Sequence, residues 1–222
     1  MHKVEKIAYP IIALYVAVIA IWAVIDPEYY TTVLAREDGV VEWLTVLGLV
    51  LSCGVALHRA VTLKAQKTKM FVFVWGFLAL FAFFGAGEEI SWGQRIFNIE
   101  SSEWFKQNNA QAETNLHNLV VEGKKVNKII FSMLLGIALL TYLLVFSVAY
   151  RKSEKFRAFC EYFGVPIAQW HQVAAWFAVA IVAEGFIKHI GRSSELFESA
   201  ASFVFLLNIL YPYNSKSFER QA

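Results

Sequence analysis

The sequence is poor in the residues that a disulfide-stapled fold or a soluble enzyme would need. It has 2 cysteines in 222 residues, too few for a disulfide framework, so Cys53 and Cys160 are expected to be free thiols. Charged residues make up 17% of the chain, against roughly a quarter in ordinary soluble domains. The net charge of +2 provides no strongly basic face, which argues against a nucleic-acid partner.

Apolar residues, by contrast, are abundant. Hydrophobic residues make up 58% of the chain and aromatic residues 16%, with a mean hydropathy of +0.49. A single soluble core of this length cannot hide so much apolar surface, so much of it must face lipid. The composition therefore predicts an all-α polytopic membrane helix bundle that forms a single integral membrane domain over residues 1–222.

Apolar runs along the chain predict six transmembrane helices. The expected spans are residues 7–25, 40–62, 70–95, 129–149, 166–187 and 196–213. The third helix is extended to Arg95 because no proline interrupts it. Between the spans lie an outer loop, 98–128, and a segment, 151–163, whose aromatic residues at helical spacing are typical of a helix in the membrane interface.

Details of two spans predict contacts between helices. The second span has a face of small residues at Gly48, Ser52 and Ala56, which permits close helix packing. Asn208, deep in the sixth span, is expected to form a hydrogen bond with another helix. Twelve of the 20 Lys and Arg residues flank one side of the predicted bundle. The positive-inside rule then places both termini in the cytoplasm.

The stretch 85–118 contains the most conspicuous polar residues. Glu88, Glu89 and Arg95 follow an apolar run, and charged groups at the rim of a hydrophobic segment are candidates for function. Glu88 lies 18 residues after Met70 in the sequence. At 1.5 Å per residue that is roughly 27 Å of helix, nearly the whole hydrocarbon thickness. Glu88 is therefore expected at the outer rim.

Other acids and imidazoles are expected at the same depth. Glu184 occupies the equivalent place in the fifth span, His189 follows it, and His117 can fold back from the outer loop. Together with Glu88 they form a plausible carboxylate–imidazole site for Zn, Mn or Fe, which could activate a water. Glu88, Glu89 and Arg95 are the candidate catalytic residues, with Arg95 holding Glu88 or an anionic head group. The alternative is that these residues are merely solvated at the membrane interface.

A second pair of histidines lies near the cytoplasmic side. His58 is near the end of the second span, and His171 is near the start of the fifth. Two histidines at comparable depth on different helices could ligate a haem b iron axially. The alternative is a pair of separate helix-end histidines, each with a local hydrogen-bond partner.

The block GEEISWGQRIFNIESSEWFKQNNAQAETNLHNL, with the upstream REDGVVEWLTVLGL, resembles an uncharacterised family of bacterial multi-pass inner-membrane proteins. The resemblance covers about residues 36–145 and implies the plasma membrane of a bacterium, but no activity. There is a faint similarity to CAAX-type intramembrane proteases. Their arginine lies four positions after the second Glu of the pair, however, whereas Arg95 lies six positions after Glu89. Alkaline-ceramidase-like hydrolases use a His-x-x-x-His pair, which this sequence lacks.

Three functions remain open on the sequence. The first is a metal-dependent hydrolase or transferase acting on a lipid or lipid-linked substrate. The second is a non-catalytic subunit or sensor that docks onto another membrane protein through the loop 98–128. The third is proton-coupled transport, although no broken helix or inverted repeat marks a midplane site.

Overall fold

The computed structural model describes residues 1–121, 124–125 and 133–220, and this part of the chain is predominantly helical. Its principal helices are α1 (Lys3–Ile25), α3 (Val40–Leu63), α4 (Lys69–Glu89), α8 (Glu154–Phe163), α9 (Trp170–Ala180) and α10 (Ser193–Leu210). One continuous helix consists of α6 (Leu135–Leu140), the π-helical segment Thr141–Phe146 and α7 (Ser147–Lys152). The shorter helices are α2 (Pro27–Tyr29), α5 (Glu103–Asn108) and the π-helical segments Tyr30–Leu34 and Ile181–Phe186. The remaining elements are the 3-10 turns Ser91–Gly93, Lys188–Ile190 and Ser215–Phe218, and the antiparallel strands β1 (Val120–Val121) and β2 (Lys124–Lys125).

Among the described residues, five helices are long and apolar enough to cross a membrane: α1, α3, α4, the helix Leu135–Lys152 and α10. The helical, multi-pass character expected from the composition is therefore present in the structure. The expected fifth span is helical from Trp170 to Phe186, shorter than the other five. The beginning of the expected fourth span, 129–132, and part of the expected loop 98–128 lie outside the described residues.

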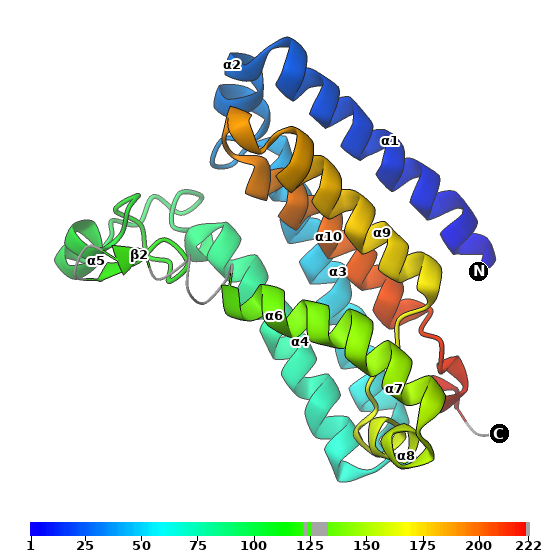
Figure 1. Ribbon diagram of the computed structural model, residues 1–222. Coiled ribbons are helices and arrows are strands. Elements are labelled where there is room, and N and C mark those ends of the chain that lie inside the picture. The colour runs from blue at the N-terminus through cyan, green and yellow to red at the C-terminus, as the bar shows by residue number, and fades with distance from the viewer. Residues whose placement is uncertain (122–123, 126–132, 221–222) are drawn as a thin grey trace.

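The helix α10 is the centre of the bundle. It packs against α3 on one side and against α9 and α1 on the other (Figure 1). Gly48 allows α3 to approach α10 closely, because a Cβ at this position would clash with the Oγ of Ser202 on α10. Ser52 and Ala56, the other members of the predicted small-residue face, are also fully buried. The prediction of close packing along this face is confirmed.

Polar side chains join α9 to α10 inside the bundle. The Oδ1 of Asn208 accepts a hydrogen bond from Trp176 at 2.7 Å, and its Nδ2 donates to the Oε1 of Gln172 at 2.8 Å. All three residues are buried. The predicted hydrogen bond of Asn208 to another helix is therefore confirmed.

Two predicted boundaries are wrong. The third helix ends at Glu89 rather than Arg95, because Ser91, Trp92 and Gly93 all have positive φ angles (45°, 55° and 75°), which an α-helix cannot contain. The helix expected from Pro166 begins at Trp170, because the preceding residues are extended. That segment is held by a hydrogen bond from the backbone N–H of Tyr213 to the carbonyl of Ile167 at 2.7 Å.

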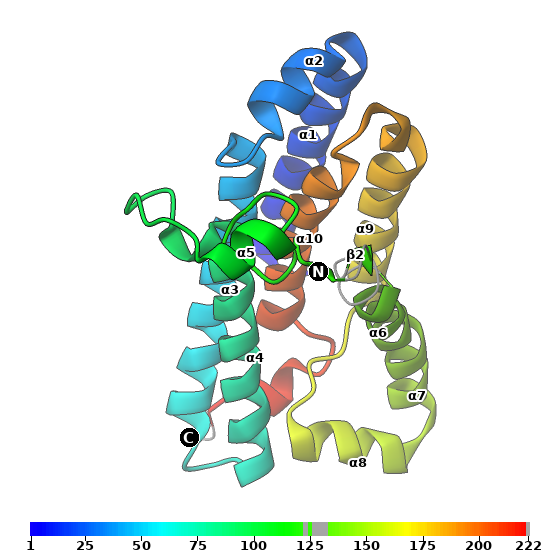
Figure 2. The same cartoon turned by 90° about the vertical axis from the view of Figure 1, so that its left-hand side faces the viewer.

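The short helix α8 lies across one end of the bundle, between the ends of α7 and α4 (Figure 2). Ser153 caps its start, and Gly164 ends it in the left-handed conformation, with φ 66°. The indole Nε1 of Trp75 donates to the carbonyl of Gly164 at 2.9 Å and ties α8 to α4. The loop that carries α5 and β2 projects from the side of the bundle beyond the end of α4 (Figure 1).

Candidate functional site

The reversal after α4 folds the outer loop back onto the end of the bundle. The indole of Trp92 lies over the last turn of α4, where a Cβ on Gly87 would be 2.8 Å from the ring. Only glycine at position 87 leaves room for this ring. The Nε1 of Trp92 also donates to the Oε1 of Glu88 at 2.8 Å. The two residues therefore meet through a turn rather than along one helix face.

Glu88 fastens the loop to α4. Its side chain is buried, and its Oε2 accepts hydrogen bonds from the backbone N–H groups of Leu116 and His117, the latter at 3.0 Å. With the bond from Trp92, three donors surround one carboxylate, so the hydrogen-bonding capacity of this buried group is met within the protein. The predicted catalytic and metal-binding residue Glu88 thus has a full set of partners of its own.

Arg95 is the centre of an ion-pair network. Its Nε lies 2.7 Å from Asp38, its Nη1 2.7 Å from Glu113, and its Nη2 3.4 Å from Glu42. A fourth carboxylate, that of Glu37, lies 3.8 Å from its Nη1. The network connects the segment before α3 to the outer loop. Arg95 therefore does not bind Glu88, in contrast to the prediction. Its guanidinium is surrounded by these four acids, which leaves no side of it open to an anionic head group.

A small, strongly acidic cavity of about 50 Å³ lies under the loop, between the ends of α3, α4 and α10. It is lined by Glu37, Glu42, Glu89, Gln111, His117, Asn118, Ser194, Glu195 and Glu198. Five of these side chains are carboxylates, and none belongs to Lys or Arg. Glu37 and Glu42 are paired with arginines, whereas no salt bridge within the described residues reaches the other three acids.

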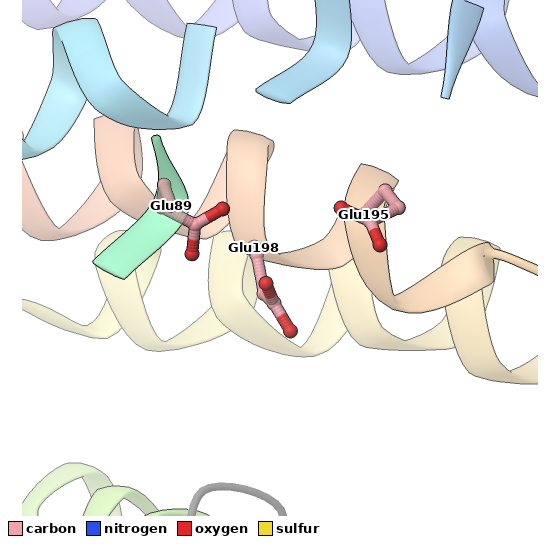
Figure 3. A group of neighbouring side chains, drawn as sticks. All are labelled: Glu89, Glu195 and Glu198. Carbon is pink, nitrogen blue, oxygen red and sulfur yellow. The ribbon is translucent and has the colours of Figure 1, made fainter. Parts of the chain in front are cut away.

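The remaining three acids form a triad. One oxygen from each of Glu89, Glu195 and Glu198 lies within 4.8 Å of the other two. Glu89 comes from the last residue of α4, and Glu195 and Glu198 come from neighbouring turns at the start of α10 (Figure 3). Glu89 and Glu195 are half-buried, and Glu198 is exposed. Like charges at this separation repel one another, and a bound cation or proton would relieve the repulsion.

His117 lines the same cavity as the triad. Burial lowers its pKa below the ordinary value of 6.5, although the nearby carboxylates of Glu88, Glu37 and Glu113 oppose the shift. The imidazole is therefore neutral at pH 7, the form that can accept a proton or ligate a metal. Its Nε2 lies 3.0 Å from the Nδ2 of Asn118.

The other predicted site residues lie elsewhere. Glu184 is 44% exposed and pairs with Lys188 at 3.3 Å, and His189 is exposed in the following turn. Neither lines the acidic cavity. Of the predicted metal set, the structure brings Glu88 and His117 together, while Glu89, predicted as catalytic, joins two acids of α10.

The two histidines considered for haem have separate surroundings. The Nε2 of His171 lies 2.8 Å from the fully buried carboxylate of Glu5. His58 is exposed on α3, where it lines an apolar groove. The atom of His171 that could ligate iron thus already has a partner.

Glu195 and Glu198 were absent from the predicted site. Their spacing of three residues puts both on one face of a helix, and they stand at the start of an apolar run, as Glu88 and Glu89 stand at the end of one. This similarity to Glu88 and Glu89 is the feature of the sequence from which Glu195 and Glu198 could have been predicted as site residues.

No family model, curated protein or solved structure matches the chain. Its function has therefore to be inferred from the geometry of its own residues.

Proposed function

We propose that the chain crosses the inner membrane of a bacterium six times, with both termini in the cytoplasm. The sixth crossing would be the helix from Trp170 to Phe186, whose 11-residue α-helical and six-residue π-helical parts reach the lower limit of a spanning helix. The distribution of Lys and Arg supports this orientation. In it, the acidic cavity faces the outer side and α8 lies at the cytoplasmic interface.

At the outer rim, we propose a binding site for a divalent cation held by Glu89, Glu195 and Glu198. The observation that carries this proposal is the approach of their oxygens to within 4.8 Å in a cavity that no Lys or Arg of the described residues lines. Carboxylate ligands favour the hard cations Mg²⁺, Ca²⁺ and Mn²⁺. Mn²⁺ is the one ion shared with the set expected from the sequence, since Zn and Fe sites draw more heavily on His and Cys.

The site would serve the hydrolysis or transfer of a group on a lipid or lipid-linked substrate. A bound divalent cation supplies Lewis acidity and lowers the pKa of a bound water. The chain itself provides His117, a neutral base on the wall of the same cavity. Glu88 and Arg95 act as positioning residues in this account, because they hold the loop that carries His117.

Metal analysis of the purified protein tests the cation site. The wild-type chain, loaded with Mn²⁺ and passed over a desalting column, should retain about one ion per chain, whereas E195Q and E198Q should not. The matched control is E184Q, because Glu184 is an exposed rim glutamate outside the cavity. Equal retention by all four proteins, or by none, would overturn the proposal.

A second function has its own supporting observation. Four large apolar residues in and just before the outer loop are strongly exposed: Ile96 (56%), Phe97 (71%), Ile99 (58%) and Trp104 (53%). Exposed apolar groups on a polar loop are typical of a docking surface, so the chain could act as a subunit of a membrane complex. Photocrosslinking from position 104 in native membranes tests this: a single protein adduct supports docking, and lipid adducts alone contradict it.

A further inference from the structure

The opposite end of the molecule has a groove that the outer site does not use. It has a volume of about 720 Å³ and follows the second half of α3, where the C-terminal tail returns to the bundle. Val50, Leu51 and Val55 form its apolar walls. Gly54 leaves its middle open, because no atom of the described residues lies within 4 Å of the place where a Cβ would be. The volume falls within the roughly 300–1,000 Å³ of small-ligand sites.

One end of this groove is basic. It is lined there by His58, Arg59 and Arg220. The guanidinium of Arg59 donates to the carbonyls of Ile209 and Leu210 and lies over the ring of Phe218 at 4.6 Å. Within the described residues, neither arginine forms a salt bridge with a carboxylate. Because a guanidinium has five N–H donors, Arg59 keeps donors beyond these two bonds.

The groove has the polarity and length of one leaflet of a bilayer. From Val50 to Thr62 the helix rises roughly 18 Å, close to half of the ~30 Å hydrocarbon thickness. The apolar end points toward the middle of α3, and the basic end coincides with the end of the span at Leu63. Basic groups at the edge of an apolar groove between membrane helices recognise anionic lipid head groups.

We propose that this groove binds one anionic phospholipid. Its phosphate would lie among His58, Arg59 and Arg220, and an acyl chain would follow α3 past Gly54. Charge complementarity selects an anionic lipid over a zwitterionic one, because no carboxylate of the described residues lines the groove beside the basic groups. The proposal is independent of the cation site, which lies at the other end of α3.

The test is lipid binding to the detergent-purified full chain by native mass spectrometry, with phosphatidylglycerol and phosphatidylcholine as probes. The wild-type chain should retain one phosphatidylglycerol in preference to phosphatidylcholine. Replacing both exposed basic groups, in H58Q/R220Q, should weaken phosphatidylglycerol binding at least roughly tenfold, the loss expected for a charge-assisted hydrogen bond. Arg59 is left intact because it caps the end of α10.

The acyl chain is tested by G54L, which extends a side chain into the groove from a position where an added Cβ meets no described atom within 4 Å. Its control is G76L on α4, since Gly76 also has no atom within 4 Å of its absent Cβ. K155Q, which removes an exposed charge on α8, controls for nonspecific attraction. Loss of binding in G54L and H58Q/R220Q, but in neither control, supports the proposal. Unchanged binding in either groove variant, equal retention of the two lipids, or full competition by inorganic phosphate alone would overturn it.

Discussion

The carboxylate of Glu88 accepts a hydrogen bond from the backbone N–H of His117 at 3.0 Å. A residue at the end of α4 therefore fixes the position of a loop residue 29 places later in the chain. This bond places the imidazole of His117 on the wall of the acidic cavity. Glu88 therefore contributes to the site through the loop rather than as a ligand. The role can be tested separately from any activity.

Glu88→Gln should loosen the loop without unfolding the bundle. The substitution replaces a carboxylate oxygen by an NH₂ group, which leaves a buried N–H without an acceptor and costs roughly 1–3 kcal/mol. Hydrogen–deuterium exchange of peptides containing Leu116 and His117 should accelerate, while peptides from α10 keep wild-type rates. E184Q serves as the control. Wild-type exchange at residues 116–117 in E88Q would show that Glu88 does not fasten the loop.

Arg95→Gln should destabilise the same region through charge. Removing the guanidinium leaves Asp38, Glu42 and Glu113 close together without their shared cation. Removing one partner of a buried ion pair lowers the free energy of unfolding by up to roughly 3–5 kcal/mol. We expect a lower thermal midpoint in detergent and faster cleavage of the loop by protease. Lys106→Gln, which removes an exposed partner of Glu103, should change neither. A normal midpoint in R95Q would contradict the network's structural role.

Gly48→Leu should be among the most damaging substitutions in the apolar part of the chain. Its side chain would meet Ser202 at less than van der Waals distance, so α3 and α10 would have to separate. Overpacking of this kind costs roughly 1–3 kcal/mol. The thermal midpoint in detergent should fall for G48L, while G76L, on a surface with free space, keeps it. Equal midpoints for the two variants would mean that the close approach of α3 and α10 does not contribute to the stability of the bundle.

The low pKa of His117 predicts that stability falls in mild acid. Because the folded chain binds its proton more weakly than the unfolded chain, whose pKa is near 6.5, the contribution of His117 is complete above pH 6.5. It is lost as the pH falls from there toward the folded pKa. Thermal midpoints measured between pH 8 and pH 5 should therefore drop less in His117→Gln than in wild type. The other histidines are present in both proteins, so their effects cancel, and identical pH profiles would contradict the prediction.

Much of the fold could be predicted because hydrophobicity acts locally along the chain. The start of α3 at Val40 and its small-residue face follow directly from the sequence, as does the cross-helix bonding of Asn208. The reversal after Glu89 could not be predicted in this way. The left-handed conformations of Ser91 and Trp92 are unfavourable by themselves and persist because the Glu88 carboxylate and the Arg95 network hold the loop.

The acidic triad could not be predicted in full for a similar reason. Glu88 and Glu89 were both expected at the outer rim. Which of the two faces α10, however, depends on how α4 is rotated and packed. Glu184 was expected at the same depth, yet its side chain pairs with Lys188 and does not line the cavity. Depth along a helix can be counted from the sequence, whereas the direction of a side chain depends on tertiary packing.

The most direct test of the cation site is an anomalous difference map from crystals of the protein grown with Mn²⁺. We predict one strong peak between the carboxylates of Glu89, Glu195 and Glu198, and its loss in E195Q crystals grown under the same conditions. Manganese bound elsewhere, or a triad that keeps its geometry without a peak at millimolar Mn²⁺, would contradict a metal-binding function for the outer rim.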